Sequence, residues 1–114
     1  MPYIHTTTTT IISREDEALL RRRMGEAIAS IPGKSEYWLM LAFTDGCRMA
    51  FRGDAEDDCV MLEVSIFGTA SEEALARLTR VLTDTVCEVL AVDGERVYIK
   101  YTMTDHWGYN GENF

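Results

Sequence analysis

The hydrophobic periodicity of this chain changes from the spacing of a strand to that of a helix and back, and it does so twice. The clearest strand is Cys59–Phe67, where apolar side chains occupy every second position. A period of two places alternate side chains on opposite faces of a sheet, so one face of this strand is predicted to be buried. The side chains expected on that face are Val60, Leu62, Val64 and Ile66.

The N-terminal part of the chain is predicted to form a strand followed by a helix. The β-branched run Tyr3–Ile11, which contains five threonines, favours a strand. Ser13 is expected to cap a helix, with Asp16 in the capping-box position, and Pro32-Gly33 to end it. The residues with helical spacing on its apolar face are Leu20, Met24, Ala27, Ile28 and Ile31.

The middle of the chain contains a second apolar run and an acidic loop. Tyr37–Thr44 is continuously apolar over the length of a strand. Arg48–Phe51 is expected to form a short strand that ends at Gly53. The carboxylates that follow, within residues 54–58, lack the spacing of a calcium loop and are interpreted as a solvated loop.

The C-terminal half repeats the pattern of the first. Ser71 is predicted to cap a second helix, and Asp93-Gly94 to turn the chain into a last main strand, Arg96–Thr102. The tail, Asp105–Phe114, is expected to be an ordered loop or a small hairpin. The apolar face of the second helix comprises Leu75, Leu78, Leu82, Val86 and Val89.

These elements predict one α/β (α+β) domain spanning residues 1–114: a four-stranded mixed sheet of tandem βαβ repeats, with two helices on one face. Two helices leave the other face of the sheet uncovered. Yet residues 38–43 are apolar at both odd and even positions, as in a strand that is buried on both sides. A homo-oligomer that packs sheet against sheet is therefore expected. The alternative is a semi-polar second face with scattered exposed apolar side chains.

Composition narrows the function classes. The chain length of 114 residues fits one domain of roughly 100–150 residues. The 19 acidic and 11 basic residues give a net charge of −8, which disfavours binding to a phosphate backbone. The three cysteines form no CxxC pair, and the two histidines belong to no metal-ligand pattern. With no signal-peptide pattern at the N-terminus and no apolar membrane span, a cytosolic location is expected.

Several short segments in order resemble the macrophage migration inhibitory factor family of the tautomerase superfamily, which also contains D-dopachrome tautomerase. They are Met1-Pro2, Pro32-Gly33-Lys34, Ser65-Ile66-Phe67-Gly68, residues 93–99 and residues 107–114. The resemblance implies a homotrimer with active sites between subunits. It also implies cofactor-independent keto–enol tautomerisation of phenylpyruvate-like α-keto acids. A different function within the family, a secreted cytokine-like ligand whose pocket is vestigial, is the alternative. Such a ligand would be released without a signal peptide and would bind a receptor.

The resemblance assigns the chemistry to three residues. Once Met1 is removed, Pro2 carries a secondary amine and is the expected general base. Burial and a nearby cation both lower the pKa of an amine, which keeps it neutral and basic near pH 7. Lys34 is expected to bind the substrate's carboxylate or carbonyl oxygen, and the backbone N–H of Ile66 to bind substrate as well. Without the resemblance, Pro2 is a rigid start to a strand and Lys34 an exposed lysine after a helix.

The remaining site residues implied by the resemblance are aromatic or cationic. Tyr98 aligns with the aromatic residue that reaches into a neighbouring subunit's site. Lys100 stands where asparagine is frequent, so it either adds a second cation to the site or pairs with a surface acid. The aromatic wall of the pocket is expected to be Trp38, Tyr109 and Phe114, and each of these could instead be ordinary packing.

Overall fold

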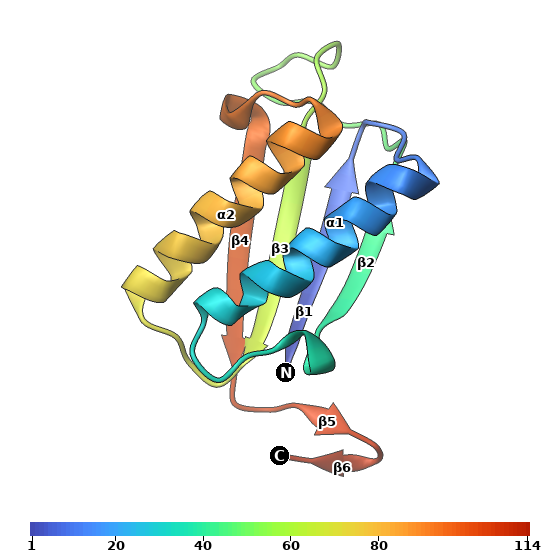
Figure 1. Cartoon of the computed structure of the whole chain (residues 1–114). Helices are drawn as coiled ribbons and strands as arrows, with labels where there is room; N and C mark the ends of the chain where they lie inside the picture. The colour runs from blue at the N-terminus through green and yellow to red at the C-terminus, as the bar shows by residue number, and fades with distance from the viewer.

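The computed structural model describes residues 1–114 and contains one four-stranded sheet with two long helices on one of its faces (Figure 1). A short C-terminal hairpin lies beyond one end of the sheet. The main elements are β1 (Pro2–Thr8), α1 (Arg14–Ala27), β2 (Met40–Thr44), β3 (Val60–Phe67), α2 (Glu72–Leu90), β4 (Val97–Thr104), β5 (Gly108–Tyr109) and β6 (Glu112–Asn113).

The strand order β2-β1-β3-β4 confirms the predicted mixed sheet. β1 runs parallel to β2, and β3 runs parallel to β4. The two βαβ units join where β1 and β3 pair antiparallel, with Pro2 opposite Ile66. This central pairing places the N-terminus beside the C-terminal end of β3.

Both helices begin at the predicted serine caps. Ser13 Oγ accepts a hydrogen bond from the Asp16 amide at 3.1 Å, and Ser71 Oγ accepts one from the Ala74 amide at the same distance. Each bond satisfies a backbone donor that the first turn of a helix otherwise leaves unpaired. The capping signals in the sequence therefore determined where both helices start.

The core lies between the helices and one face of the sheet. The side chains of Leu62 and Ile66 are completely buried there, as the alternating pattern of β3 predicted, and so is the side chain of Ile4 in β1. Burying an aliphatic side chain of this size contributes roughly 1.5–3 kcal/mol. The side chains of α1 and α2 that complete the core include Leu20, Met24, Ile28, Leu78, Leu82 and Val86.

The predicted strand Tyr37–Thr44 is wrong in its first half. Glu36–Trp38 forms a 3₁₀ turn, closed by the Leu39 amide donating to the Glu36 carbonyl at 3.1 Å, and β2 begins only at Met40. β2 is also an edge strand, and within one chain it is not buried on both faces: Met40 is 67% exposed. The prediction failed because Tyr37 and Trp38, which are exposed aromatic residues of a turn, are as apolar as the residues of a buried strand.

Other boundaries also differ from the sequence predictions. The first helix ends at Ala27, with a 3₁₀ turn at Ile28–Ser30 before Pro32, and β4 runs over Val97–Thr104 because Arg96 lies in a 3₁₀ turn. β1 ends at Thr8 rather than at Ile11. The predicted strand Arg48–Phe51 is absent, because Phe51 forms only an isolated bridge with Asp54. Thr9 and Thr10 leave the sheet and instead bond to neighbouring loops: the Thr9 hydroxyl donates to Asp58, and the Thr10 carbonyl accepts from the Gly46 amide.

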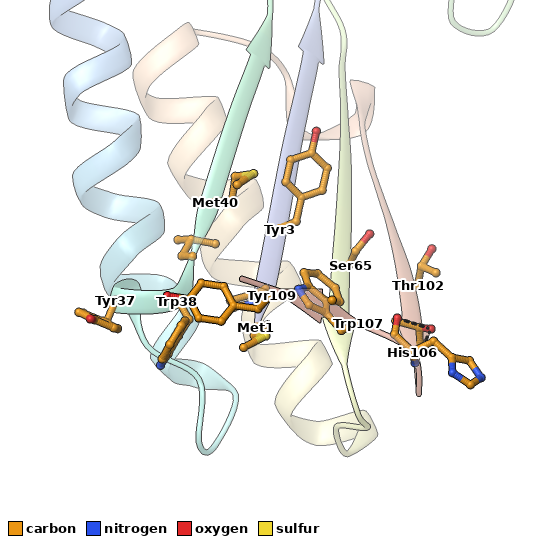
Figure 2. A pocket seen from close by; sticks show the side chains of 14 residues that line it. Met1, Tyr3, Tyr37, Trp38, Met40, Ser65, Thr102, His106, Trp107 and Tyr109 are labelled. Carbon is orange, nitrogen blue, oxygen red and sulfur yellow. Dashed lines mark hydrogen bonds between the residues drawn. The ribbon is translucent and has the colours of Figure 1, made fainter. Parts of the chain in front are cut away.

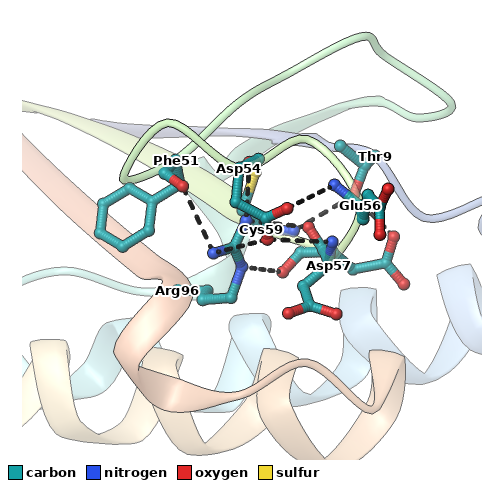
Figure 3. A network of polar contacts seen from close by, with 8 residues as sticks. Thr9, Phe51, Asp54, Glu56, Asp57, Cys59 and Arg96 are labelled. Carbon is teal, nitrogen blue, oxygen red and sulfur yellow. Dashed lines mark hydrogen bonds and ion pairs between the residues drawn. The ribbon is translucent and has the colours of Figure 1, made fainter.

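In place of a strand, the Arg96 guanidinium holds the acidic loop of residues 54–58 in position (Figure 3). It donates to the backbone carbonyls of Asp57 and Asp58, both at 2.9 Å, and to that of Asp54 at 3.2 Å. A guanidinium presents several donors in a fixed plane, so one side chain can satisfy carbonyls that no sheet ladder reaches. The acidic loop is thus held mainly through its backbone, and the Asp54 carboxylate adds an ion pair to Arg96 and accepts from the Glu56 amide. No helix of this chain has the length and apolar character needed to cross a membrane.

Candidate active site

The N-terminus lies at the edge of the helix-covered core. Pro2 is buried at the start of β1, and the Met1 carbonyl accepts a hydrogen bond from the Phe67 amide at 3.1 Å. Phe67 is the last residue of β3, and Gly68 follows it with φ +86°. The end of β3 therefore fixes the position of the first residues of the chain.

Lys34 is brought to the same place by the turn after α1. Its Nζ donates to the Phe67 carbonyl at 2.7 Å, and the side chain is half-buried. Burial lowers the pKa of the Met1 amino group below its usual value, and the positive charge of Lys34 lowers it further. The residue pattern placed Lys34 only after a helix, and the resemblance implied a place near the N-terminus. In the structure its ammonium lies beside the N-terminal amine.

Next to the N-terminus is a hollow of about 370 Å³. It contains all three aromatic residues that were predicted to wall the pocket, so the structure brings together residues from the 3₁₀ turn and from the C-terminal tail. The residues that line it are Met1, Trp38, Tyr109, Asn110, Glu112, Asn113 and Phe114.

The aromatic rings contact one another in a chain. Trp38 and Tyr109 meet edge to face, with ring centroids 5.1 Å apart, and Tyr109 stacks on Phe114 at 6.3 Å. Phe114 also packs against Phe67 at 5.9 Å. Trp38, Tyr109 and Phe114 nevertheless remain 41–58% exposed, so their faces are available to a ligand. Aromatic pairs at such distances stabilise one another by about 0.5–1.5 kcal/mol, which favours a fixed wall over mobile rings.

A second and larger pocket of about 900 Å³ opens from the same residues onto the sheet face that no helix covers (Figure 2). Met1, Trp38 and Tyr109 line both spaces. The floor of the larger pocket is formed by side chains of all four strands, among them Tyr3, Met40, Ser65 and Thr102. Sequence reasoning missed this pocket, because its lining alternates with core residues along each strand.

Tyr98 and Lys100 do not join the site of their own chain. Tyr98 lies opposite Met61 at the start of β4, and its ring meets Phe51 edge-on at 5.0 Å. Because Pro2 lies opposite Ile66 at the other end of β3, the length of the sheet separates Tyr98 from the N-terminus. Lys100 Nζ lies 3.4 Å from Glu63 Oε1, which agrees with the interpretation that it pairs with a surface acid.

The resemblance implied that the backbone N–H of Ile66 binds substrate, whereas in the structure the amide that contacts the N-terminal residue is that of Phe67. The Ile66 side chain is completely buried in the core, and Ile66 lies opposite Met103 in the parallel β3–β4 ladder. The backbone amide that faces the N-terminal residue is that of Phe67. No sequence signal separates the two residues, because which amide points towards β1 depends on the register of the sheet.

Comparisons with known proteins agree with this geometry. The model of the macrophage migration inhibitory factor (MIF) family matches residues 1–114. The fold is similar to that of Leishmania major MIF2, with 25% identity, a TM-score of 0.93, and coverage of 100% of this chain and 97% of that chain. It is also similar to Toxoplasma gondii macrophage migration inhibitory factor, with 18% identity, a TM-score of 0.90, and coverage of 98% and 99%.

A third structure is informative about chemistry in a similar fold. Pt0534, whose structure was solved after inactivation by 2-oxo-3-pentynoate, is 20% identical, with a TM-score of 0.76 and coverage of 90% of this chain and 85% of that chain. Pt0534 therefore reacts with a 2-oxo acid. A search of curated protein sequences gave no match.

Proposed function

The chain belongs to the macrophage migration inhibitory factor family, and on this basis we propose that it is a cofactor-independent keto–enol tautomerase of phenylpyruvate-like α-keto acids. The observation that carries the proposal is the position of the N-terminal amine. It lies in a partly buried setting beside the ammonium of Lys34 and next to a hollow walled by aromatic rings. Inactivation of Pt0534 by a 2-oxo acid supports this substrate class.

Pro2 is the proposed general base, and Met1 must be removed for it to act. In the intact chain the Pro2 nitrogen is an amide without basicity. After removal it is a secondary amine close to the point where burial and Lys34 already lower the pKa of the Met1 amine. The same two effects hold the Pro2 amine in its neutral form at a pH where an ordinary amine is charged.

Removal of Met1 also releases a hydrogen-bond donor. The Phe67 amide now donates to the Met1 carbonyl, so processing leaves this N–H free at the same place. We assign the substrate-binding backbone donor to Phe67 in preference to Ile66 for this reason. Together the Phe67 N–H and the Lys34 ammonium form two donors that can hold a carboxylate or a developing enolate oxygen.

The reaction moves one proton within the substrate. The Pro2 nitrogen takes a proton from the carbon next to the keto group, and the electrons of that C–H bond form the enol double bond. The carbonyl π electrons move to oxygen, and the proton is then returned from Pro2 to that oxygen. The opposite direction restores the ketone, so no cofactor is consumed. The rings of Trp38, Tyr109 and Phe114 suit an aromatic substrate and limit access of water.

A homotrimer with shared sites completes the proposal. The open sheet face and the large pocket are the surfaces that further copies would cover. Within one chain Tyr98 is at the far end of the sheet from Pro2, so only the Tyr98 of another copy can approach that site. Closed cyclic symmetry gives every copy an identical site of this kind.

The decisive experiment changes only the N-terminus. Processed protein, with loss of one methionine verified by intact-mass spectrometry, should interconvert phenylpyruvate and its enol, followed by enol absorbance. A protein with one extra residue before Pro2 should lose this activity, because its Pro2 nitrogen is an amide. Pro2→Ala, with Met1 removed, retains a primary amine and should be strongly impaired but still active. Equal rates for extended and processed proteins would remove Pro2 from the mechanism. If neither protein is active, the tautomerase proposal fails and the cytokine-like ligand remains as the alternative.

A further inference from the structure

The C-terminal hairpin presents three side chains on one face. Asn110 and Gly111 both have positive φ angles, of 51° and 82°, as a tight two-residue hairpin turn requires. This turn sets Tyr109 opposite Glu112. Residues directly opposite in an antiparallel pair project to the same side, and so do residues two apart along a strand. Glu112 therefore shares its face with Tyr109 and with Phe114.

That face is turned towards the smaller hollow and held there. The Phe114 amide donates to the Trp107 carbonyl at 2.9 Å, which closes the end of the hairpin. The Tyr109 ring rests edge to face against Trp38, and the Phe114 ring packs against Phe67 at a tilt. Glu112 is accordingly one of the residues that line the hollow.

The carboxylate of Glu112 has no cationic partner in the chain. None of the five ion pairs includes it. The Lys34 ammonium is bonded to the carbonyl of Phe67 and forms no ion pair with Glu112. The hollow is thus bordered by aromatic faces and an unpaired carboxylate on the hairpin, while the ammonium lies where β3 ends.

We propose that Glu112 is a specificity-determining residue, which selects substrates that carry a cationic group at the end remote from the keto acid. The inference rests on the proposed function, which places the keto acid at Lys34 and Pro2. Aromatic faces attract cations, and a carboxylate makes a charge-assisted hydrogen bond to an ammonium group. A substrate with a second carboxylate at its remote end would meet repulsion from Glu112.

The first test compares three phenylpyruvates that differ only in the para group: 4-aminomethyl, 4-methyl and 4-carboxy. The processed protein should show kcat/KM for the aminomethyl acid about three- to tenfold above that for the methyl acid, and lowest for the carboxy acid. Glu112→Gln should remove this ranking. Glu15→Gln removes the same charge from the first turn of α1, on the helix layer and away from the open sheet face, and should retain the ranking. A ranking that survives Glu112→Gln, or is lost equally in Glu15→Gln, overturns the proposal.

A binding measurement separates this inference from the catalytic proposal. The matching arylacetates, 4-(aminomethyl)phenylacetate and 4-methylphenylacetate, lack a keto group, and calorimetry reports their affinity without any turnover. The aminomethyl compound should bind more tightly to the processed protein, by a similar factor, and Glu112→Gln should abolish the difference. Equal affinities overturn the role of Glu112 even where phenylpyruvate is turned over. A preserved difference in a protein that does not turn over phenylpyruvate sustains Glu112 and refutes the tautomerase.

Discussion

The two faces of the sheet are made from alternate residues of the same strands, yet they differ in character. On the helix-covered face, β1 and β3 present Ile4, Leu62 and Ile66, all fully buried. On the open face the same strands present Tyr3, His5, Glu63 and Ser65, which are half-exposed. One face is therefore specified by apolar burial within the chain, whereas the other is open and mixed in polarity.

A row of polar side chains crosses the open face at mid-sheet. Thr44 Oγ1 lies 2.8 Å from His5 Nε2, and His5 Nδ1 lies 3.4 Å from Glu63 Oε2. Glu63 in turn pairs with Lys100. Exposed pairs of this kind contribute about 0–1 kcal/mol each, so the row adds little to folding. Its presence shows that the middle of the open face is polar, whereas Met40 and Tyr98 at its ends are large, apolar and exposed.

The strongest test of the comparison is the mass of the particle. If the open face is covered by further copies, sedimentation equilibrium at micromolar concentration should give about three chain masses, as closed symmetry with shared sites requires. Tyr98→Glu, which places a charge on that face, should lower the mass. A wild-type monomer would mean that the open face is simply exposed and that Tyr98 cannot serve another copy's site.

The next largest effect concerns stability. Leu62→Ala on the covered face removes a fully buried side chain and should lower the free energy of unfolding by about 2–5 kcal/mol. Its neighbour Met61 points to the open face and is only half-buried, so Met61→Ala is the matched control and should cost less. Urea denaturation measures both. Equal losses would show that the open face is packed as closely as the covered one.

The two lysines of the chain provide a test of substrate binding, because one lies beside the N-terminus and the other on the open face. Lys34→Ala should weaken keto acid binding by about 1.5–3 kcal/mol, through loss of a charge-assisted contact, and should weaken binding of the corresponding ester less. Lys100→Ala is the control, because Lys100 pairs with Glu63. Titration calorimetry on the processed protein measures each affinity. A comparable loss in Lys100→Ala would show that this lysine is a second cation of the site.

The smallest effect is a dependence of stability on alkaline pH. Burial raises the pKa of the Tyr101 phenol, which lies on the covered face and donates to the Leu75 carbonyl at 3.2 Å. A raised pKa means that the folded state favours the neutral phenol. Its contribution is therefore complete below pH ~10, the ordinary value for tyrosine, and is lost as the pH rises further. Denaturation measures the free energy of unfolding from about pH 9 to about pH 11. The fall of this free energy with pH should be smaller in Tyr101→Phe than in the wild type, and unchanged in Tyr98→Phe.

Local sequence patterns determined most of the scaffold. The caps at Ser13 and Ser71, the alternation along β3 and the helical spacing of Leu78, Leu82 and Val86 each depend on residues close together in the chain. Such patterns fix the fold class because an amphipathic strand or helix has one way to bury its apolar face. The order of the segments then leaves few topologies for a right-handed βαβ repeat.

Only the tertiary structure decided how the site is assembled. The sequence could not show that Trp38 belongs to a turn, because an aromatic wall and a buried strand are equally apolar. Nor could it show that Arg96 holds the acidic loop, or that the amide facing Met1 is that of Phe67 and not of Ile66. These features depend on sheet register and on contacts between distant segments. A one-residue change in register reverses which groups point towards β1, and no local pattern in the sequence carries that information.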